Sequence, residues 1–320
     1  ENSKAVLKQP DNSHNLFVLP RPRAKSLTDL SYIAQRKFSN KSANGSGVIT
    51  LDGLTAGGEV YTNTGDWVYA KADSDIIAAS PTVTLSGGGT GGTVDFGTSS
   101  DVATVASSSN IEYLAYVSKT QSTPKTKTLV TRTLQNTVDS DGAGLKTINL
   151  KRADAFEIIS VVNSSDSNES FANRFVFDNG QRTSHYDPAR LILKNGQSAP
   201  SGNVTITYKH FEHSTSGDYF SVNSYTGQVD YKDIPSYTSP DGSTINLREV
   251  IDFRSVADSA GNFNTSGATM LEVPQSGSII TADTTYNLGV GGKLVIDNQS
   301  SLDFLFGSNG FLPQPPAAPS

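Results

Sequence analysis

The amino-acid sequence predicts an all-β protein of two or three small β-sandwich or barrel-like domains, with extended linkers and a short N-terminal helix. Charged residues make up 18% of the chain, while Ser, Thr, Asn and Gly are abundant between short β-branched and aromatic runs. This punctuation is typical of short antiparallel strands joined by tight turns. With 14 Phe, 12 Tyr and one Trp, the 320 residues hold enough large apolar side chains for about two domains.

Residues 1–45 are predicted to form an extended basic arm that carries the short helix. Eight Lys or Arg residues against three acidic ones give this segment a net charge of +5, so the remainder carries −11 within a total of −6. Arg21 and Arg23 are therefore candidates for contact with an acidic surface of a neighbouring copy, the alternative being a solvated tail. Ser26 is a candidate N-cap, and apolar residues follow it at helical spacing: Leu27, Leu30, Ala34 and Phe38.

Residues 46–126 are predicted to form a β domain, which could be an insertion. Seven strand-like runs lie between Gly-rich turns: VITL, EVYTN, WVYA, PTVTLS, TVDFG, DVATVA and IEYLAYVSKT. Strands so short and closely spaced fit a small sandwich or barrel. Gly87, Gly89 and Gly92 have the spacing of a dinucleotide-binding fingerprint, but a strand-like run follows where that site needs a helix. A hairpin loop is the better interpretation.

Residues 127–260 are predicted to form a second β domain. In VTITYKH, alternate residues beginning with Val204 share one face, as in a half-buried strand. INLREVIDFR, at residues 245–254, fits either a helical turn or a strand. Six residues are candidates for structural turns and their ion pairs, with the Arg pairing to one of the two Asp residues: Asp178, Asn179, Gly180, Asp187, Pro188 and Arg190.

Residues 261–320 are predicted to hold a partial β unit and a Pro-rich connector. The runs SIITAD, KLVIDN and LDFLFG indicate further strands, and FLPQPPAAPS indicates extended backbone. The only methionine is Met270. We therefore expect this chain to be a segment of a longer polypeptide.

The sequence predicts no enzyme, no cofactor, no metal site and no catalytic residue. It has no cysteine, which excludes disulfides and thiolate sites and favours folding in a reducing cytoplasm. His210 and His213 have an odd offset that would point them to opposite faces of a strand. No apolar run approaches the roughly 18 residues that span a bilayer, so membrane insertion is not expected. The acidic body disfavours nucleic-acid binding.

Residues of about 150–254 resemble a known family. The pieces that carry the resemblance are KRADAFEIISVV, RFVFDNGQR, YDPARLIL, GDYFSVNSYT, YKDIPSY and VIDFR. Together they resemble large structural proteins of T4-like contractile-tailed bacteriophages and cyanophages, above all the baseplate wedge. The resemblance implies a virion component of the tail baseplate that is made in the bacterial host cytoplasm. Its partners would be other tail and baseplate subunits.

Three tyrosines are candidates for a subunit interface. Large side chains with polar tips suit a core edge or a subunit interface, which makes these residues interface candidates: Tyr186, Tyr219 and Tyr225.

Two other functions fit the composition. A tail-fibre or adhesin module could bind host surface glycan through exposed aromatic residues, and residues 46–126 are the segment expected to carry such a site. A capsid decoration protein is a third candidate. Binding of a glycan array by residues 46–126 would favour the adhesin over the scaffold.

Overall fold

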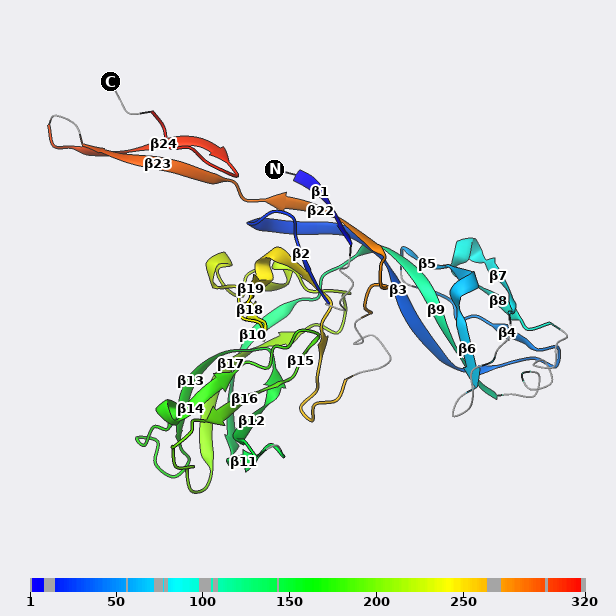
Figure 1. The fold of residues 1–320 in the computed structure, drawn as a ribbon, viewed down its shortest axis with the longest axis horizontal. Helices are drawn as coiled ribbons and strands as arrows, with labels where there is room; N and C mark the ends of the chain where they lie inside the picture. The colour runs from blue at the N-terminus through cyan, green and yellow to red at the C-terminus, as the bar shows by residue number, and fades with distance from the viewer. Residues whose placement is uncertain are drawn as a thin grey trace.

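The computed structural model describes residues 2–8, 15–55, 57–71, 77, 80–97, 105, 109–142, 144–263, 272–296 and 299–317. Within these ranges strands dominate, and the 3-10 turns η1 to η6 span three or four residues each. The expected all-β fold class is therefore confirmed. The described chain forms three lobes and one projecting hairpin (Figure 1).

The central body combines the N-terminal segment and β22 with residues 222–252, which are the last part of the second predicted domain. Its sheet contains β1 (Asn2–Lys8), β22 (Ile279–Tyr286) and the first half of β3 (Ala24–Ser42). Two short pairs complete it: β2 (Leu16–Val18) with β20 (Val250–Asp252), and β18 (Ser236–Thr238) with β19 (Thr244–Asn246). Its turns are η4 (Val222–Tyr225), η5 (Tyr231–Asp233) and η6 (Leu247–Glu249). The stretch 245–254 thus contains a helical turn followed by a strand.

The side lobe corresponds to the predicted domain 46–126 and is joined to the central body by β3. The second half of β3 pairs with β9 (Ser109–Ser122), which also pairs with β5 (Glu59–Thr62) and β6 (Val68–Lys71). A second sheet consists of β4 (Val48–Thr50), β8 (Gly91–Asp95) and β7 (Thr82–Ser86). Turn η1 is Thr64–Asp66, and η2 (Gly87–Gly89) lies in the hairpin between β7 and β8. The predicted strand DVATVA, apart from Val105, lies outside the described residues.

The sandwich lobe consists of two antiparallel sheets. One contains β10 (Lys127–Asn136), β17 (Val204–His213) and β13 (Ala155–Asn163), and the other β11 (Asp139–Ser140), β12 (Lys146–Ala153), β16 (Pro188–Leu193) and β14 (Phe175–Asp178). Turn η3 is Ala172–Arg174, and β15 (His185–Tyr186) pairs in parallel with β21 (Ser255–Val256). The core lies between the sheets and includes the predicted inward face of β17: Val204, Ile206 and Tyr208.

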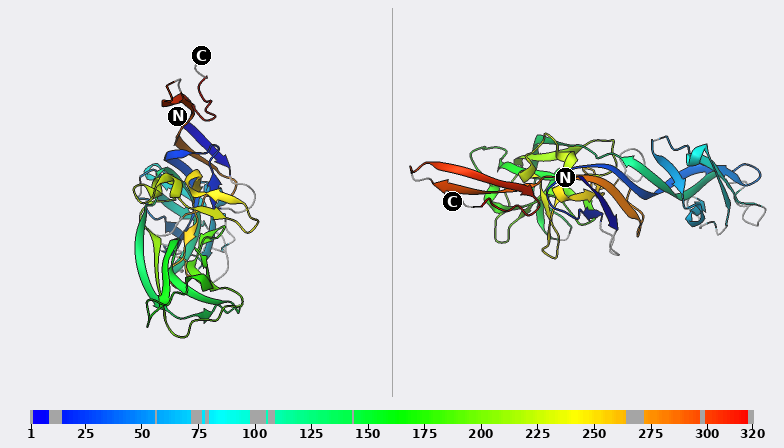
Figure 2. Two further views of the ribbon diagram at one scale, coloured as in Figure 1. Left: turned by 90° about the vertical axis from the view of Figure 1, so that its left-hand side faces the viewer. Right: turned by 90° about the horizontal axis from the view of Figure 1, so that it is seen from above.

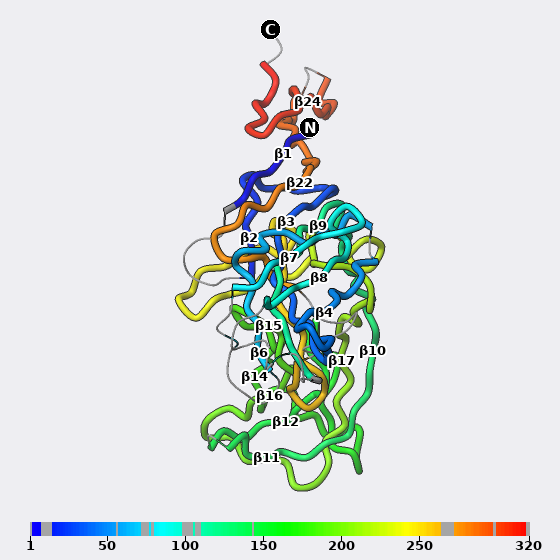
Figure 3. The backbone as a smooth tube through the Cα atoms, turned by 90° about the vertical axis from the view of Figure 1, so that its right-hand side faces the viewer, coloured from blue at the N-terminus to red at the C-terminus, as the bar shows by residue number. Residues whose placement is uncertain are grey.

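The last two strands, β23 (Gly289–Ile296) and β24 (Leu302–Gly310), form a hairpin that extends away from the rest of the chain (Figure 1). Seen from above, the hairpin, the central body and the side lobe follow one line (Figure 2). Seen from the side, the hairpin and the N-terminus lie at the end opposite β11 of the sandwich lobe (Figure 3). The molecule is therefore elongated and branched.

The predicted N-terminal helix is wrong, because its residues belong to the 19-residue strand β3. Two β-bulges, near Lys25 and near Asp29, each add one residue to β3 opposite β22. In a regular strand every second side chain points inward, but across each bulge the next inward side chain is three residues further on. Ala24, Leu27 and Leu30 are therefore all buried. Bulges in a strand have thus produced a helix-like spacing of apolar residues.

The predicted separate arm at residues 1–45 is also wrong. Leu16, Phe17 and Leu19 are between 3% and 7% exposed and pack in the same core as Ile251 and Ile280. The segment therefore supplies three strands, β1, β2 and the first half of β3, and part of the core of the central body. Burial of its apolar side chains is favourable, because it removes their surface from water. This gain is larger than the cost of holding the basic residues near the core.

The bulge near Asp29 can be tested by mutation, since Asp29 is exposed and has a φ of 52°. We expect Asp29→Val to lower the free energy of unfolding by about 1–2 kcal/mol, because a β-branched side chain tolerates the left-handed region poorly. Asp29→Gly should stay within about 1 kcal/mol of wild type. Urea unfolding measures both, with the exposed Thr28→Val as the control. Equal losses in Asp29→Val and Thr28→Val would contradict the bulge.

Candidate functional site

Motifs that carry the family resemblance meet at a buried junction between the sandwich lobe and the central body. We call this the central charge cluster, and it consists of Lys127, Asp154, Tyr186, Asp252 and Arg254. Lys127 begins β10, Asp154 lies between β12 and β13, and Asp252 ends β20. The four charged side chains are 0–3% exposed. The junction therefore holds four charged groups that are excluded from solvent.

The hydrogen bonds of the central charge cluster run through the hydroxyl of Tyr186. The Lys127 Nζ donates to Asp154 Oδ2 at 2.6 Å and to Tyr186 Oη at 3.3 Å. Tyr186 donates in turn to Asp252 Oδ2 at 2.5 Å, and Arg254 Nη2 donates to Tyr186 Oη at 2.7 Å and to Asp252 Oδ2 at 2.8 Å. Two cations thus face two carboxylates, so the cluster is neutral as a whole.

Aromatic rings surround the ammonium group of Lys127. Its Nζ lies 4.7 Å from the ring centroid of Tyr186, 4.6 Å from that of Phe220 and 4.9 Å from that of Tyr225. Such cation–π contacts are strongest where water is excluded. The rings therefore stabilise the buried charge together with the carboxylate of Asp154.

Electrostatics keep this junction ionised. Burial would raise the pKa of Asp154, but Lys127 and the hydrogen bond from His213 Nε2, at 2.8 Å, hold that pKa well below its usual range. Burial opposes the charged form of Lys127, yet Asp154 raises the pKa of the lysine. Burial lowers the pKa of His213, so the neutral ring donates Nε2–H to the carboxylate. Every charged or polar group of the cluster therefore has a partner within the chain.

A second group of charges lies where the side lobe meets the central body. We call it the interlobe network, and it consists of Arg36, Glu59, Lys119, Asp218 and Glu272. Both Nη atoms of Arg36 donate to Glu59, at 2.9 and 2.8 Å, and Nη2 also donates to Glu272 at 2.8 Å. Lys119 contacts Glu59 and Glu272 at 3.2 Å each, and it bonds to Asp218. The network ties β3, β5 and β9 to segments of the central body.

The predicted turn residues lie together at one edge of the sandwich lobe. Asp178 accepts hydrogen bonds from Arg182, at 3.0 and 2.8 Å, and from Arg190 Nε at 3.0 Å. Asp187, which precedes Pro188 at the start of β16, is paired instead with Arg182 and His185. Burial would raise the pKa of Asp178, but the arginines and the Gly180 N–H lower it. Of the two carboxylates considered for Arg190, the structure places Asp178 beside it.

The dipeptide Asn179-Gly180 forms the turn that brings this edge together. Gly180 has a φ of 84°, and an added Cβ would overlap the backbone carbonyl oxygen of Asp187. The Gly180 N–H donates to Asp178 Oδ1 at 3.0 Å, while the Gly180 carbonyl accepts from the Asp187 N–H at 2.7 Å. Both conformation and space therefore require glycine here.

The tyrosines expected at a subunit interface are buried inside this chain instead. Tyr186 and Tyr219 are 0% exposed and Tyr225 is 2% exposed, because each packs in a hydrophobic core of the chain. This is a correction to the prediction, since such residues are not available to a second subunit. Phe220 beside them is 1% exposed.

Arg21 and Arg23 are exposed but contact their own chain. The guanidinium carbon of Arg21 lies 4.8 Å from the ring centroid of Phe311. The backbone of Arg23 bonds to Glu249 and to Asn287, next to the base of the hairpin. The basic segment thus contacts the C-terminal part of its own chain, and docking on a neighbouring copy stays a prediction.

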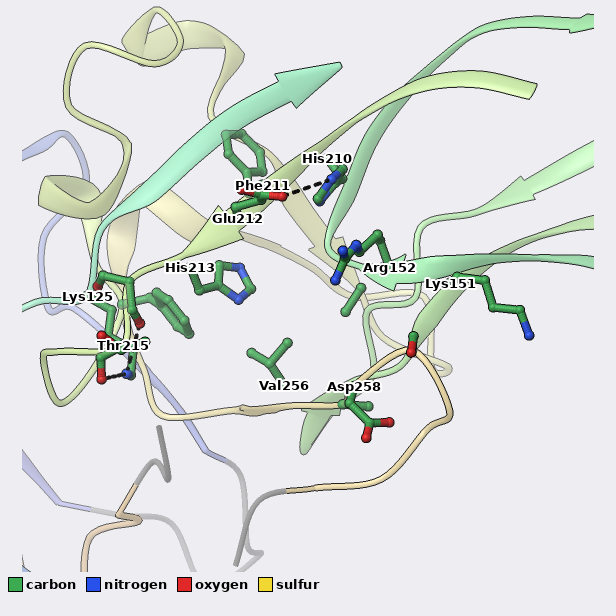
Figure 4. Close-up of a pocket in the computed structure, with 15 residues that line it drawn as sticks. Lys125, Lys151, Arg152, His210, Phe211, Glu212, His213, Thr215, Val256 and Asp258 are labelled. Carbon is green, nitrogen blue, oxygen red and sulfur yellow. Dashed lines mark hydrogen bonds and ion pairs between the residues drawn. The ribbon is translucent and has the colours of Figure 1, made fainter. Parts of the chain in front are cut away.

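A cavity of about 400 Å³ opens beside the central charge cluster (Figure 4). Arg152 and His213 point toward it, whereas Lys151 points away. Other charged residues on its wall are Lys125, Glu212 and Asp258, so cations and carboxylates are nearly balanced. His210, 2% exposed, makes no hydrogen bond through Nε2, and the nearest Glu212 oxygen is 3.9 Å away. This balance gives the cavity no strong preference for an anion or a cation.

Within the described ranges, no group of three or more His, Cys, Asp or Glu side chains could hold a metal ion. In the same residues, no helix has the length and hydropathy needed to cross a membrane. Sequence reasoning missed Lys127, Asp154, Asp252 and Arg254. A signal for the last two was present, since charged residues stand inside the apolar run VIDFR.

We expect Gly180→Ala to lower the free energy of unfolding by about 1–3 kcal/mol more than Gly196→Ala. Gly196 has a similar φ of 80°, but nothing lies within 4 Å of the site of its added Cβ. The difference between the two variants therefore isolates the overlap with the Asp187 carbonyl. Denaturant unfolding measures it, and equal losses would contradict the tight turn.

We expect Asp154→Asn to lower the free energy of unfolding by about 3–5 kcal/mol, because it leaves Lys127 buried and uncompensated. The control Asp233→Asn, in a pair whose side chains are 77% and 51% exposed, should cost less than about 1 kcal/mol. Because folding depresses the pKa of Asp154, its stabilising effect is complete above the ordinary Asp value and is lost as pH falls below about 4. Unfolding measured from pH 7 to 2 should show a weaker acid dependence in Asp154→Asn. Identical pH profiles would refute this assignment.

No protein-family model matches this chain, and no curated protein matches it. Among solved structures, the pilus backbone protein of Streptococcus pneumoniae aligns with 93% of this chain and 63% of its own chain, at 12% identity. The TM-score of 0.15 means that this similarity carries no argument about fold or function.

Proposed function

We propose that this chain is a structural subunit of a phage contractile tail, placed in the baseplate wedge. Its partners are other tail and baseplate subunits, and its place is the virion. The proposal rests on the resemblance of residues 150–254 to structural proteins of T4-like phages, together with an elongated all-β architecture.

The observation that carries the proposal is where the resembling motifs lie. Asp154 belongs to KRADAF, Tyr186 to YDPARLIL, and Arg254 to VIDFR, and all three meet in the central charge cluster. Each of their polar groups is paired at a buried junction between lobes. Residues arranged in this way fix the position of one lobe against another.

Fixed lobes suit a mechanical role. Buried, hydrogen-bonded charges tolerate little displacement, because separating them without water is costly. The interlobe network holds the side lobe, and the central charge cluster holds the sandwich lobe. A protein built in this way keeps bound neighbours at set distances, as a baseplate spacer requires.

Glycan binding by residues 46–126 receives less support. Stacking on sugar rings needs exposed aromatic faces, but most aromatic residues of the side lobe lie in its core, between 1% and 7% exposed: Tyr61, Trp67, Tyr69, Phe96 and Tyr113.

The proposed location can be tested on source phage particles with gold-labelled antibodies raised against this chain. We expect label at the distal plate of the tail in electron micrographs. Antibodies absorbed beforehand with the purified protein serve as the control and should leave particles unlabelled. Label on fibre tips or on the head, or no label on particles, would overturn the proposal.

A further inference from the structure

The C-terminal hairpin leaves its apolar side chains largely in water. Five large residues are between 49% and 67% exposed: Leu294, Ile296, Leu302, Phe304 and Phe306. A two-stranded hairpin alone is marginally stable, and soluble chains rarely expose so many adjoining apolar groups without a binding role. This part of the structure therefore calls for a partner.

These side chains form one continuous surface. Opposite positions in the register are Gly292 with Phe306, Leu294 with Phe304, and Ile296 with Leu302, so all six residues share a face. The rings of Phe304 and Phe306 are 4.8 Å apart between centroids. We call this surface the hairpin apolar face, and it contains no charged residue.

The opposite face of the hairpin is partly covered by the chain itself. An added Cβ at Gly291 would meet the backbone of Gln314 and Pro315, and one at Gly307 would overlap the Gln314 carbonyl oxygen. The two glycines thus allow the Pro-rich segment to lie directly on the hairpin. That segment occupies the side of Lys293 and Asp303, which leaves the apolar face free.

The base of the hairpin is held in a defined direction. The ring of Phe311 packs against that of Tyr286, at 5.8 Å between centroids, and beneath the guanidinium of Arg21. Tyr286 is buried in the central body. Anchoring of this kind lowers the entropic cost of binding, because the surface is positioned before a partner arrives.

We propose that the hairpin apolar face binds the same face of a second copy of this chain. In a two-fold contact the two surfaces are identical. An apolar face without charged residues therefore packs against an apolar face without charged residues, and no charge is buried. Each chain carries a net charge of −6, and like-charged bodies repel. The contact lies on a projecting arm, which keeps the two acidic bodies apart (Figure 1).

The contact area suffices for a reversible dimer. Burying five such side chains removes roughly 100 Å² each, or about 1,000 Å² over both copies, which reaches the lower limit for specific interfaces. Two stacked hairpins would lie about 10 Å apart as a four-stranded sandwich. The inference does not depend on where in a virion the protein lies.

Sedimentation velocity of the full chain tests the contact. We expect wild type to shift from the 33.9 kDa monomer to a dimer at micromolar concentrations. Leu294→Lys should raise the dimer Kd at least tenfold, while Ile159→Lys should leave it unchanged. Ile159 is the matched control, because it is 52% exposed on β13 of the sandwich lobe. A wild type that stays monomeric, or equal dimerisation of both variants, would overturn the proposal.

Cross-linking provides a readout that preserves the apolar face. The chain has no cysteine, so Leu294→Cys introduces a single thiol. A short bis-maleimide should link Leu294→Cys into dimers and leave Ile159→Cys monomeric. Equal yields of cross-linked dimer in both variants would indicate chance collision and contradict the contact. If the face associates only when another tail protein is added, that protein and not a second copy is the partner.

Discussion

The arrangement of the lobes depends on the burial of Lys127 and Arg254 against Asp154 and Asp252. A charge removed from water is tolerated only with a partner and a full set of hydrogen bonds. These four residues come from three segments, since Asp252 and Arg254 are two residues apart, and Tyr186 connects them. The pairing is complete only when the sandwich lobe and the central body take this relative position. The buried ion pairs therefore favour one orientation of the two lobes.

Polarity is distributed in an unusual way along this chain. Charges are buried at the junctions, where they specify orientation, while apolar side chains are exposed on the C-terminal hairpin, where nothing in the described chain covers them. Rigid joints inside and an apolar face outside are consistent with an assembly subunit. Each lobe has its own core, and the long strand β3 carries the backbone from one lobe to the next.

Local patterns predicted local structure well. Alternation in VTITYKH indicated a strand with an inward face, and Asn179-Gly180 indicated a turn with positive φ. The pattern at Leu27 and Leu30 misled, because a β-bulge changes the spacing of inward residues from two to three. Tyr186 and Tyr219 also misled, since an amphipathic ring suits a core and an interface equally.

The sequence by itself determined the all-β class, most strand positions and the turn chemistry, because these depend on neighbours a few residues apart. Tertiary structure alone decided which charges meet, that β1, β2 and the first half of β3 contribute to the central core, and that Arg21 braces Phe311. Those outcomes depend on contacts between distant segments, and the burial that makes Lys127 pair with Asp154 exists only after the lobes have packed.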